Sequence, residues 1–183
     1  MNIKQLLARV AAQLDEDFLA EDARALALSY MNEAYADLMK VYRPYIDVIA
    51  VAEDGIVTRE GLGAHVGRVL RARGGGMEWT VRESVEAGAA GGDAGCIEVG
   101  GSGRVALRCR YVPEELEADG DEPELPAGYH GALADYATTR LMDNGGRARQ
   151  QRGEMFYARY LQRRATLAPE SAAWRDAVIN KYG

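Results

Sequence analysis

Residues 125–141 read LPAGYHGALADYATTRL, and this stretch decides how the helical part of the chain is interpreted. Pro126 suits the first turn of a helix, where its missing N–H costs nothing. The glycines in Asn144-Gly145-Gly146 form a typical helix end. Between these two signals, apolar and aromatic residues recur at helical spacing: Tyr129, Ala132, Leu133, Tyr136, Ala137, Arg140 and Leu141.

Three further segments have the same helical period. Residues 3–14 carry an apolar stripe that begins with Ile3, Leu6 and Leu7. Residues 20–42 continue in the same way, and Arg43-Pro44 ends that helix because a residue before proline avoids the helical region. Residues 147–167 predict a fourth helix, with Gly153 placed for close packing against another helix.

The period changes towards two between residues 45 and 112. Residues 45–52 are rich in β-branched residues, and Asp54-Gly55 predicts a hairpin along which residues 56–58 return. Residues 104–112 alternate apolar and mostly charged side chains, which is typical of a strand with one wet face. Further short strands are expected at residues 65–72, 77–82 and 96–99.

These elements predict a mainly α fold with a β insertion. We expect an antiparallel helical bundle, built from two N-terminal and two C-terminal helices, with a small antiparallel β subdomain between them. The domains would be 1–44 plus 125–167 for the bundle, 45–124 for the β subdomain with its glycine-rich hairpins and acidic linker, and 168–183 for a C-terminal segment.

Composition excludes several classes of protein. The 183 residues are 48% hydrophobic and 27% charged, which is typical of a folded domain. A net charge of −6 argues against bulk, non-specific DNA binding. The longest apolar runs are too short to span a membrane, and the first ten residues lack a signal-peptide core, so we expect a cytosolic protein at synthesis. Cys96 and Cys109 predict neither a disulfide framework nor a metal site.

Residue types that carry catalysis are present but not in recognisable order. His65 and His130 lie far apart, without a nucleophile or an orienting carboxylate in sequence, and are interpreted as structural or surface residues. The glycine-rich stretches 74–76 and 100–103 lack the lysine followed by Ser or Thr of a phosphate loop. The acidic residues of 113–124 lack calcium-loop spacing and favour a solvated linker. We therefore predict no enzyme, no metal and no organic cofactor.

The last predicted helix carries a stripe of positive charge beside an aromatic residue. This stripe is either a solvated helix face or a surface that meets an acidic partner or passing DNA. In the C-terminal segment, large apolar residues recur on one side; they either anchor this segment into a partner groove or fold back on the bundle. The candidate assembly interface is therefore Arg149, Arg152, Phe156, Arg159, Arg163, Trp174, Val178 and Tyr182.

The sequence also resembles a known family. Tyr111-Val112-Pro113 precedes an acidic linker with Asp121-Glu122-Pro123-Glu124, and the stretch 125–137 then reads LPAGYHGALADYA. This order resembles the head–tail connector (adaptor or neck) proteins of tailed bacteriophages and prophages, in which a strand ending in Tyr is followed by an acidic loop and a helix start of this kind. The resemblance covers residues 20–167.

The resemblance implies a non-enzymatic structural subunit. Its copies would form a twelvefold ring that joins the portal protein to stopper or tail proteins, at the head–tail interface of the virion and in the host cytoplasm during assembly. DNA would pass non-specifically through the lumen, and no membrane would be involved. The alternative is a cytosolic small-ligand-binding or regulatory domain unrelated to virions, with a pocket between sheet and helices.

Overall fold

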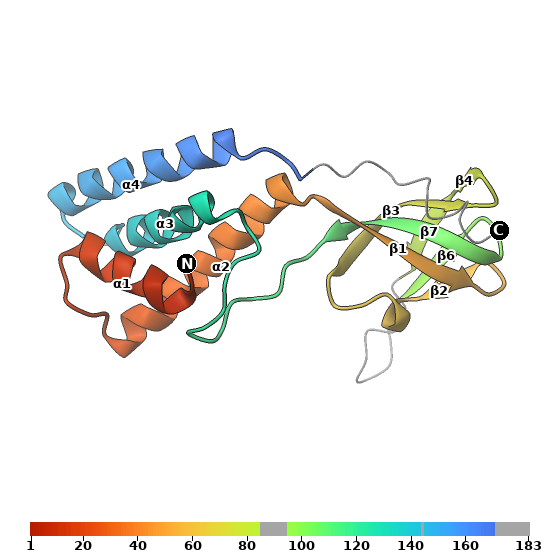
Figure 1. The fold of residues 1–183 in the computed structure, drawn as a ribbon, viewed down its shortest axis with the longest axis horizontal. Coiled ribbons are helices and arrows are strands. Elements are labelled where there is room, and N and C mark those ends of the chain that lie inside the picture. Colours follow the sequence, from red (N-terminus) through yellow and green to blue (C-terminus); the bar gives the residue numbers. More distant parts are fainter. Residues whose placement is uncertain (85–94, 144, 171–183) are drawn as a thin grey trace. The chain divides into compact units, whose positions relative to one another are not determined.

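The computed structural model describes residues 1–84, 95–143 and 145–170. These residues divide into two compact units, and each is described by itself. The first unit contains residues 1–42 and 113–169, and the second contains residues 43–112 with Glu170. In the first unit, two segments that are distant in sequence fold together into one helical core (Figure 1).

Four α-helices make up most of the first unit: α1 (Ile3–Leu14), α2 (Glu21–Tyr42), α3 (His130–Met142) and α4 (Arg147–Thr166). Asn2 begins α1 through a capping box, in which its side chain accepts a hydrogen bond from the Gln5 N–H and the Gln5 side chain binds back. Asp15 ends α1 in a left-handed conformation at φ 62°. A short 3-10 turn, Ala127–Tyr129, follows Pro126 and leads into α3.

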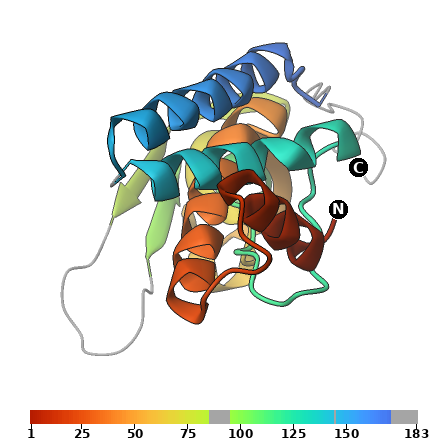
Figure 2. The same ribbon diagram turned by 90° about the vertical axis from the view of Figure 1, so that its left-hand side faces the viewer.

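Helix α3 is the centre of this unit. It packs against each of the other three helices, and Figure 2 shows it between α4 on one side and α1 and α2 on the other. Its small residues explain this position, because Gly131, Ala132, Ala134 and Ala137 are buried around its circumference. A helix buried on nearly all sides has no single apolar stripe.

The fold class expected from the sequence is wrong. The described residues are 46% helical and 25% strand, so the fold is not mainly α. The helices do not form an N-terminal pair and a C-terminal pair around an insert, because α3 joins all of them. The strands also form two antiparallel sheets instead of one small sheet.

Seven strands build the second unit among the described residues. They are β1 (Tyr45–Ala52), β2 (Ile56–Thr58), β3 (Val66–Gly74), β4 (Met77–Trp79), β5 (Val81–Ser84), β6 (Cys96–Val99) and β7 (Gly103–Tyr111). A 3-10 turn, Arg59–Gly61, follows β2. One sheet has the order β1-β7-β3-β4 and the other has the order β2-β6-β5.

The inner faces of the two sheets share one hydrophobic core, which includes Val69, Ile97, Val105, Leu107 and Cys109. The hairpin predicted between residues 45–52 and residues 56–58 does not form a paired ladder. Asp54 and Gly55 do turn the chain with positive φ of 50° and 81°, as a two-residue hairpin turn requires. However, β2 pairs with β6, and its link to the β1 side is only a single bridge between Glu53 and Ile56. The turn therefore carries the chain from one sheet to the other.

Candidate functional site

The residues predicted as a candidate surface on α4 have different environments in the structure. Phe156 is buried, and the Arg159 guanidinium lies over its ring at 4.5 Å from the centroid. Arg149 is exposed near the start of the helix. Arg152 forms an ion pair with Asp15 at the end of α1. The stripe therefore borders the buried side of α4, and the charge of Arg152 is neutralised within the unit.

Arg163 belongs to a polar cluster in the middle of the first unit. Its Nη1 lies 3.2 Å from Oδ2 of Asp135, whose side chain is 0% exposed on α3. Arg9 of α1 approaches the other carboxylate oxygen at 3.7 Å, and Gln13 donates a hydrogen bond to that oxygen at 2.6 Å. Gly131 leaves room for both guanidinium groups, since a Cβ there would lie 2.7 Å from Arg163 Nη1 and 3.0 Å from Arg9 Nη1.

This cluster orients three helices, because its members come from α1, α3 and α4. A buried carboxylate between two guanidinium groups is strongly tied to its partners. Asp135 was not among the candidate residues predicted from the sequence, although it lies within residues 125–141. The available signal was a single acidic residue one turn after Gly131, among small residues.

A second set of polar contacts joins α4 to α2. Asp37 accepts hydrogen bonds from the Tyr160 hydroxyl at 2.6 Å and from Arg164 Nε at 2.6 Å. Burial alone would raise the pKa of Asp37, but these hydrogen bonds outweigh it and hold the pKa below its ordinary value. Burial and the Asp37 carboxylate raise the pKa of Tyr160. These contacts therefore hold the inward side of α4 against α2, through the neutral Tyr160 hydroxyl and the charged Asp37 carboxylate.

The outward side of α4 has a different character. Met155 is 65% exposed, Leu161 is 44% exposed and Tyr157 is also exposed. We call this surface the α4 outward face; its charged residues are Arg147, at the first position of the helix, and Glu154. Its members are Arg147, Gln150, Gln151, Glu154, Met155, Tyr157, Ala158, Leu161, Gln162 and Ala165.

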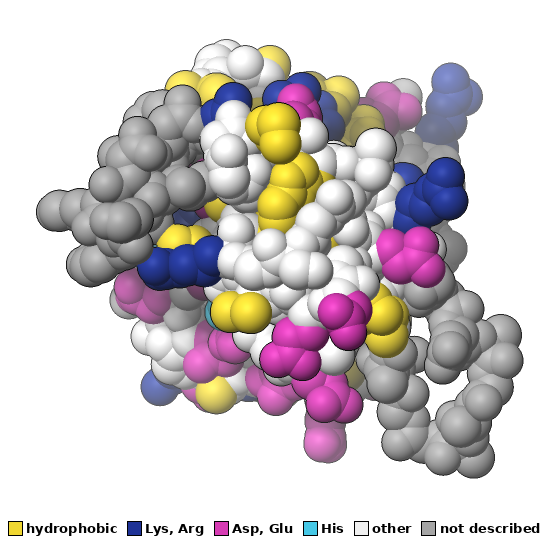
Figure 3. Space-filling view, turned by 90° about the vertical axis from the view of Figure 1, so that its right-hand side faces the viewer, with side chains coloured by type: hydrophobic (Ala, Val, Ile, Leu, Met, Phe, Trp, Pro, Cys, Tyr) yellow, Lys and Arg dark blue, Asp and Glu magenta, His cyan; other side chains and the backbone are white. Residues whose placement is uncertain are grey.

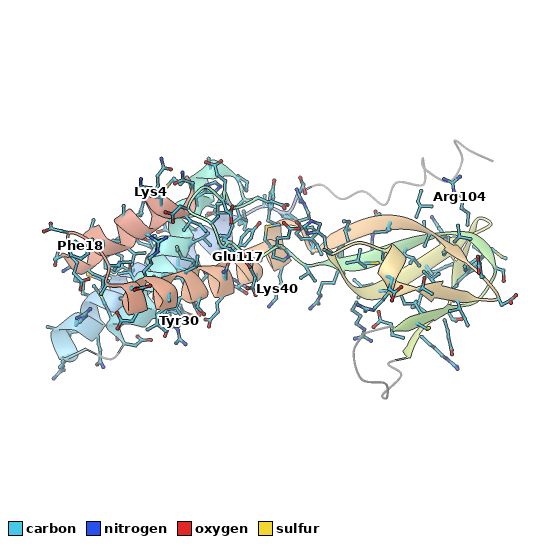
Figure 4. All side chains as sticks on the ribbon, turned by 90° about the horizontal axis from the view of Figure 1, so that it is seen from below. Lys4, Phe18, Tyr30, Lys40, Arg104 and Glu117 are labelled. Carbon is cyan, nitrogen blue, oxygen red and sulfur yellow. The ribbon has the colours of Figure 1, made fainter. Side chains whose placement is uncertain are left out.

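Another exposed aromatic lies in the loop between α1 and α2, where Phe18 is 80% exposed (Figure 4). The sequence analysis did not select Phe18 or the α4 outward face. The helical period shows which side chains share a sector, but it does not show that the sector beside Phe156 borders the inward side of α4.

The second unit carries a basic surface on the sheet β1-β7-β3-β4. Cross-strand partners share a face of a sheet, so the register places Arg110 beside Tyr45, Arg108 beside both Asp47 and Arg71, and Arg104 beside Val51. These residues lie opposite the core. We call this surface the arginine face; its charged residues are Arg71, Arg73, Arg104, Arg108, Arg110, Asp47 and Glu78.

One arginine of this face has a structural role. Arg108 donates two hydrogen bonds to Asp47, each at 2.8 Å, and its guanidinium lies 5.6 Å from the Tyr45 ring centroid. The side chain of Arg71, in contrast, is 65% exposed and lies 3.8 Å from Glu78. At the end of this unit shown in Figure 3, apolar side chains form a central band, acidic side chains gather beside it, and Lys or Arg side chains lie nearer the edges.

The two histidines occupy separate units. His130 is buried, with Nε2 2.7 Å from the Leu125 carbonyl oxygen. His65 stacks on Tyr111, with 5.4 Å between ring centroids. Trp174, Val178 and Tyr182 lie outside the described residues, so their predicted role as an anchor stays a prediction.

Within the part of the chain that the structure describes, no group of three or more His, Cys, Asp or Glu side chains could hold a metal ion. A search of the same residues finds no helix with both the length and the apolar character needed to cross a membrane. The chain matches no protein-family model, and comparison with curated proteins finds no match.

Proposed function

We propose that this protein is a non-enzymatic structural subunit of a phage head–tail connector. Its copies form a ring that joins the portal protein to stopper or tail proteins, and DNA passes through the lumen. The proposal starts from the resemblance of residues 111–137 to connector proteins. The observation that carries it furthest is the α4 outward face, which is unlike an ordinary solvated helix surface.

An exposed helix in water normally presents many charges. After Arg147 at its first position, the α4 outward face instead presents Met155, Tyr157 and Leu161 among alanines and glutamines, with Glu154 as the one charged residue among them. Interfaces between proteins are depleted in charge at their centre and enriched in Tyr and Met. We therefore assign this face to the contact between neighbouring copies in the ring.

The inward contacts of α4 support this assignment. Asp37 and Asp135 hold the helix through Arg164 and Arg163, and Gly153 lets it approach α3 closely, since a Cβ at Gly153 would lie 3.2 Å from Met142 Cβ. A helix fixed in this way loses little freedom on binding, which favours association.

The test compares Leu161→Glu on the α4 outward face with Leu26→Glu on α2, where the wild-type leucine is similarly exposed at 49%. Mass photometry and electron microscopy measure assembly, and thermal melting measures the fold. We expect wild type and Leu26→Glu to assemble, while Leu161→Glu stays monomeric with an unchanged melting temperature. A wild-type protein that is monomeric at every concentration, alone and with the portal protein, would refute the proposed function.

The predicted role of the arginine stripe needs a test that leaves the fold intact. Reversal of Arg163 would place an acid beside buried Asp135 and disturb the fold. Arg159→Glu avoids this problem, because Arg159 is exposed and contacts the Phe156 ring. If the stripe contributes to assembly, Arg159→Glu weakens association most at low salt, where charge attraction is least screened.

A further inference from the structure

We infer that the arginine face of one copy binds the acidic segment 113–124 of a neighbouring copy. This inference rests on the proposed function, because it identifies a second contact between neighbours in the same ring. The two surfaces belong to different units of the chain (Arg104 and Glu117 in Figure 4), and each has an excess of one sign of charge.

The charges of the two surfaces are complementary. The arginine face carries five arginines and two carboxylates, whereas residues 113–124 contain seven acidic residues and no Lys or Arg. The whole chain has a net charge of −6, and its charged residues outside the arginine face are mostly acidic. The excess of positive charge on the arginine face is therefore local. Complementary patches of this kind fix register and accelerate association.

The acidic segment is held in a defined conformation. Asn32 of α2 binds the backbone of Leu116 twice, accepting from its N–H at 2.9 Å and donating to its carbonyl at 3.0 Å. The Leu116 side chain is buried, while Glu115 and Glu117 on either side of it are exposed. Asp121 then accepts hydrogen bonds from the N–H groups of Glu117 and Ala118. Glu115 and Glu117 are therefore held at exposed positions by a backbone that is already ordered, while Asp119 pairs with Arg24.

The spacing of the two surfaces also agrees. Glu115 and Glu117 are two residues apart on either side of an inward-facing residue, so their carboxylates are about 7 Å apart if the backbone is extended. Arg71 of β3 pairs with Arg108 of β7, so Arg71 and Arg110 are diagonal neighbours on one face of the sheet, and diagonal neighbours are also about 7 Å apart. Arg108 itself is held by Asp47.

When a contact between two different surfaces of identical chains repeats head to tail, it closes into a ring if the rotation per copy permits. The proposed ring uses this head-to-tail arrangement. Duplex DNA is the competing occupant of an arginine-rich face, and the test therefore includes it.

The test uses two reciprocal variants of the full chain. In the first variant, Arg71→Glu and Arg110→Glu change the arginine face and leave the Arg108–Asp47 pair in place. In the second variant, Glu115→Lys and Glu117→Lys change the acidic segment. Glu16→Lys with Asp17→Lys, at exposed positions between α1 and α2, is the matched control for added positive charge. Association between copies and binding to duplex DNA are both measured by analytical ultracentrifugation at low and high salt.

We expect each reciprocal variant alone to associate at least about tenfold more weakly than wild type, with the loss largest at low salt. An equimolar mixture of the two variants should recover association, because each altered surface then meets its complement on the other variant. The control should associate as wild type does.

Three outcomes would overturn the inference: undiminished association of either variant alone, no recovery in the mixture, or loss of duplex DNA binding by the first variant with association unchanged. The first two are distinguishable from failure of the proposed function, because wild type would still assemble and Leu161→Glu would still disrupt it.

Discussion

Arg163 of α4 and Asp135 of α3 form an ion pair of 3.2 Å in which the carboxylate is completely buried and the guanidinium is partly exposed. The asymmetry means that Asp135 depends on its partners more than they depend on it. Arg9 and Gln13 also contact this carboxylate, so its negative charge is shared among groups from α1 and α4.

Asp135→Ala should destabilise the protein by about 1–3 kcal/mol, because Arg163 and Arg9 lose a shared partner but are partly exposed and keep some contact with water. Arg163→Ala should cost less, since Arg9 and Gln13 still contact Asp135. Chemical denaturation measures both changes. Asp143→Ala, which removes an exposed acid at the end of α3, is the control and should change stability by less than about 0.5 kcal/mol. Equal effects of Asp135→Ala and Asp143→Ala would contradict this account.

Leu133→Ala should cost roughly 2–5 kcal/mol, as expected for truncation of a buried leucine. Leu133 is 0% exposed on α3, the helix that all the others contact. Leu161→Ala makes the same chemical change at an exposed position of α4 and should leave the melting temperature of the monomer nearly unchanged. If the two variants melted alike, α3 would not be the centre of the core.

Stability should fall in acid partly through Asp37. Its pKa is lower in the folded protein than the ordinary value of 3.8, so its contribution is complete above that value and is lost as the pH falls through the folded pKa. Asp37→Asn removes this contribution, and the variant should lose less stability than wild type between pH about 5 and about 3. Denaturation curves across this range provide the measurement. Asp17→Asn, at an exposed loop position, should keep the wild-type slope.

The two cysteines should differ in reactivity. Cys109 is fully buried, and burial raises the pKa of its thiol to about 12; at pH about 8 only about one molecule in ten thousand carries the thiolate that reacts. Cys96 is partly exposed. Ellman's reagent should therefore modify Cys96 in the native protein and Cys109 only after unfolding. Cys96→Ala isolates the buried thiol, and rapid modification of that variant would show that the core of the second unit opens readily.

The helices were predictable where one face alone is apolar. The segment Ile3–Leu14 was predicted with the bounds that the structure gives, because its apolar positions repeat at the helical period and its other side meets water. The strand at residues 104–112 was predicted for the same reason with a period of two, and the structure places β7 at Gly103–Tyr111.

The arrangement of the elements was not predictable in the same way. Helix α3 has buried residues around its whole circumference, among them Gly131, Ala134 and Thr138. Small residues on every side leave no single apolar stripe that would show which side of the helix faces the core. The single segment expected at residues 77–82 is two strands, β4 and β5, that belong to different sheets. Strand partners depend on contacts between segments that are distant in sequence, which a local period does not report.

The partners of the polar residues in the candidate site were also not predictable from a local period. A helical wheel correctly groups Arg152, Phe156 and Arg163 in one sector, but it does not say whether that sector faces a neighbouring helix or water. Asp15 and Asp135, the acidic partners of these arginines, lie 137 and 28 residues away in sequence. Only the tertiary fold brings them together.

The position of α3 in the chain also affects the order of events during synthesis. Roughly 90 residues separate Tyr42 at the end of α2 from His130 at the start of α3, and a ribosome needs on the order of 5–20 s to add them. The second unit is nearly continuous in sequence, so we expect its sheets to form during this interval. The apolar faces of α1 and α2 wait for α3, and the α4 outward face is presented only after that core has closed. We therefore expect the proposed assembly through α4 to select finished chains over unfinished ones.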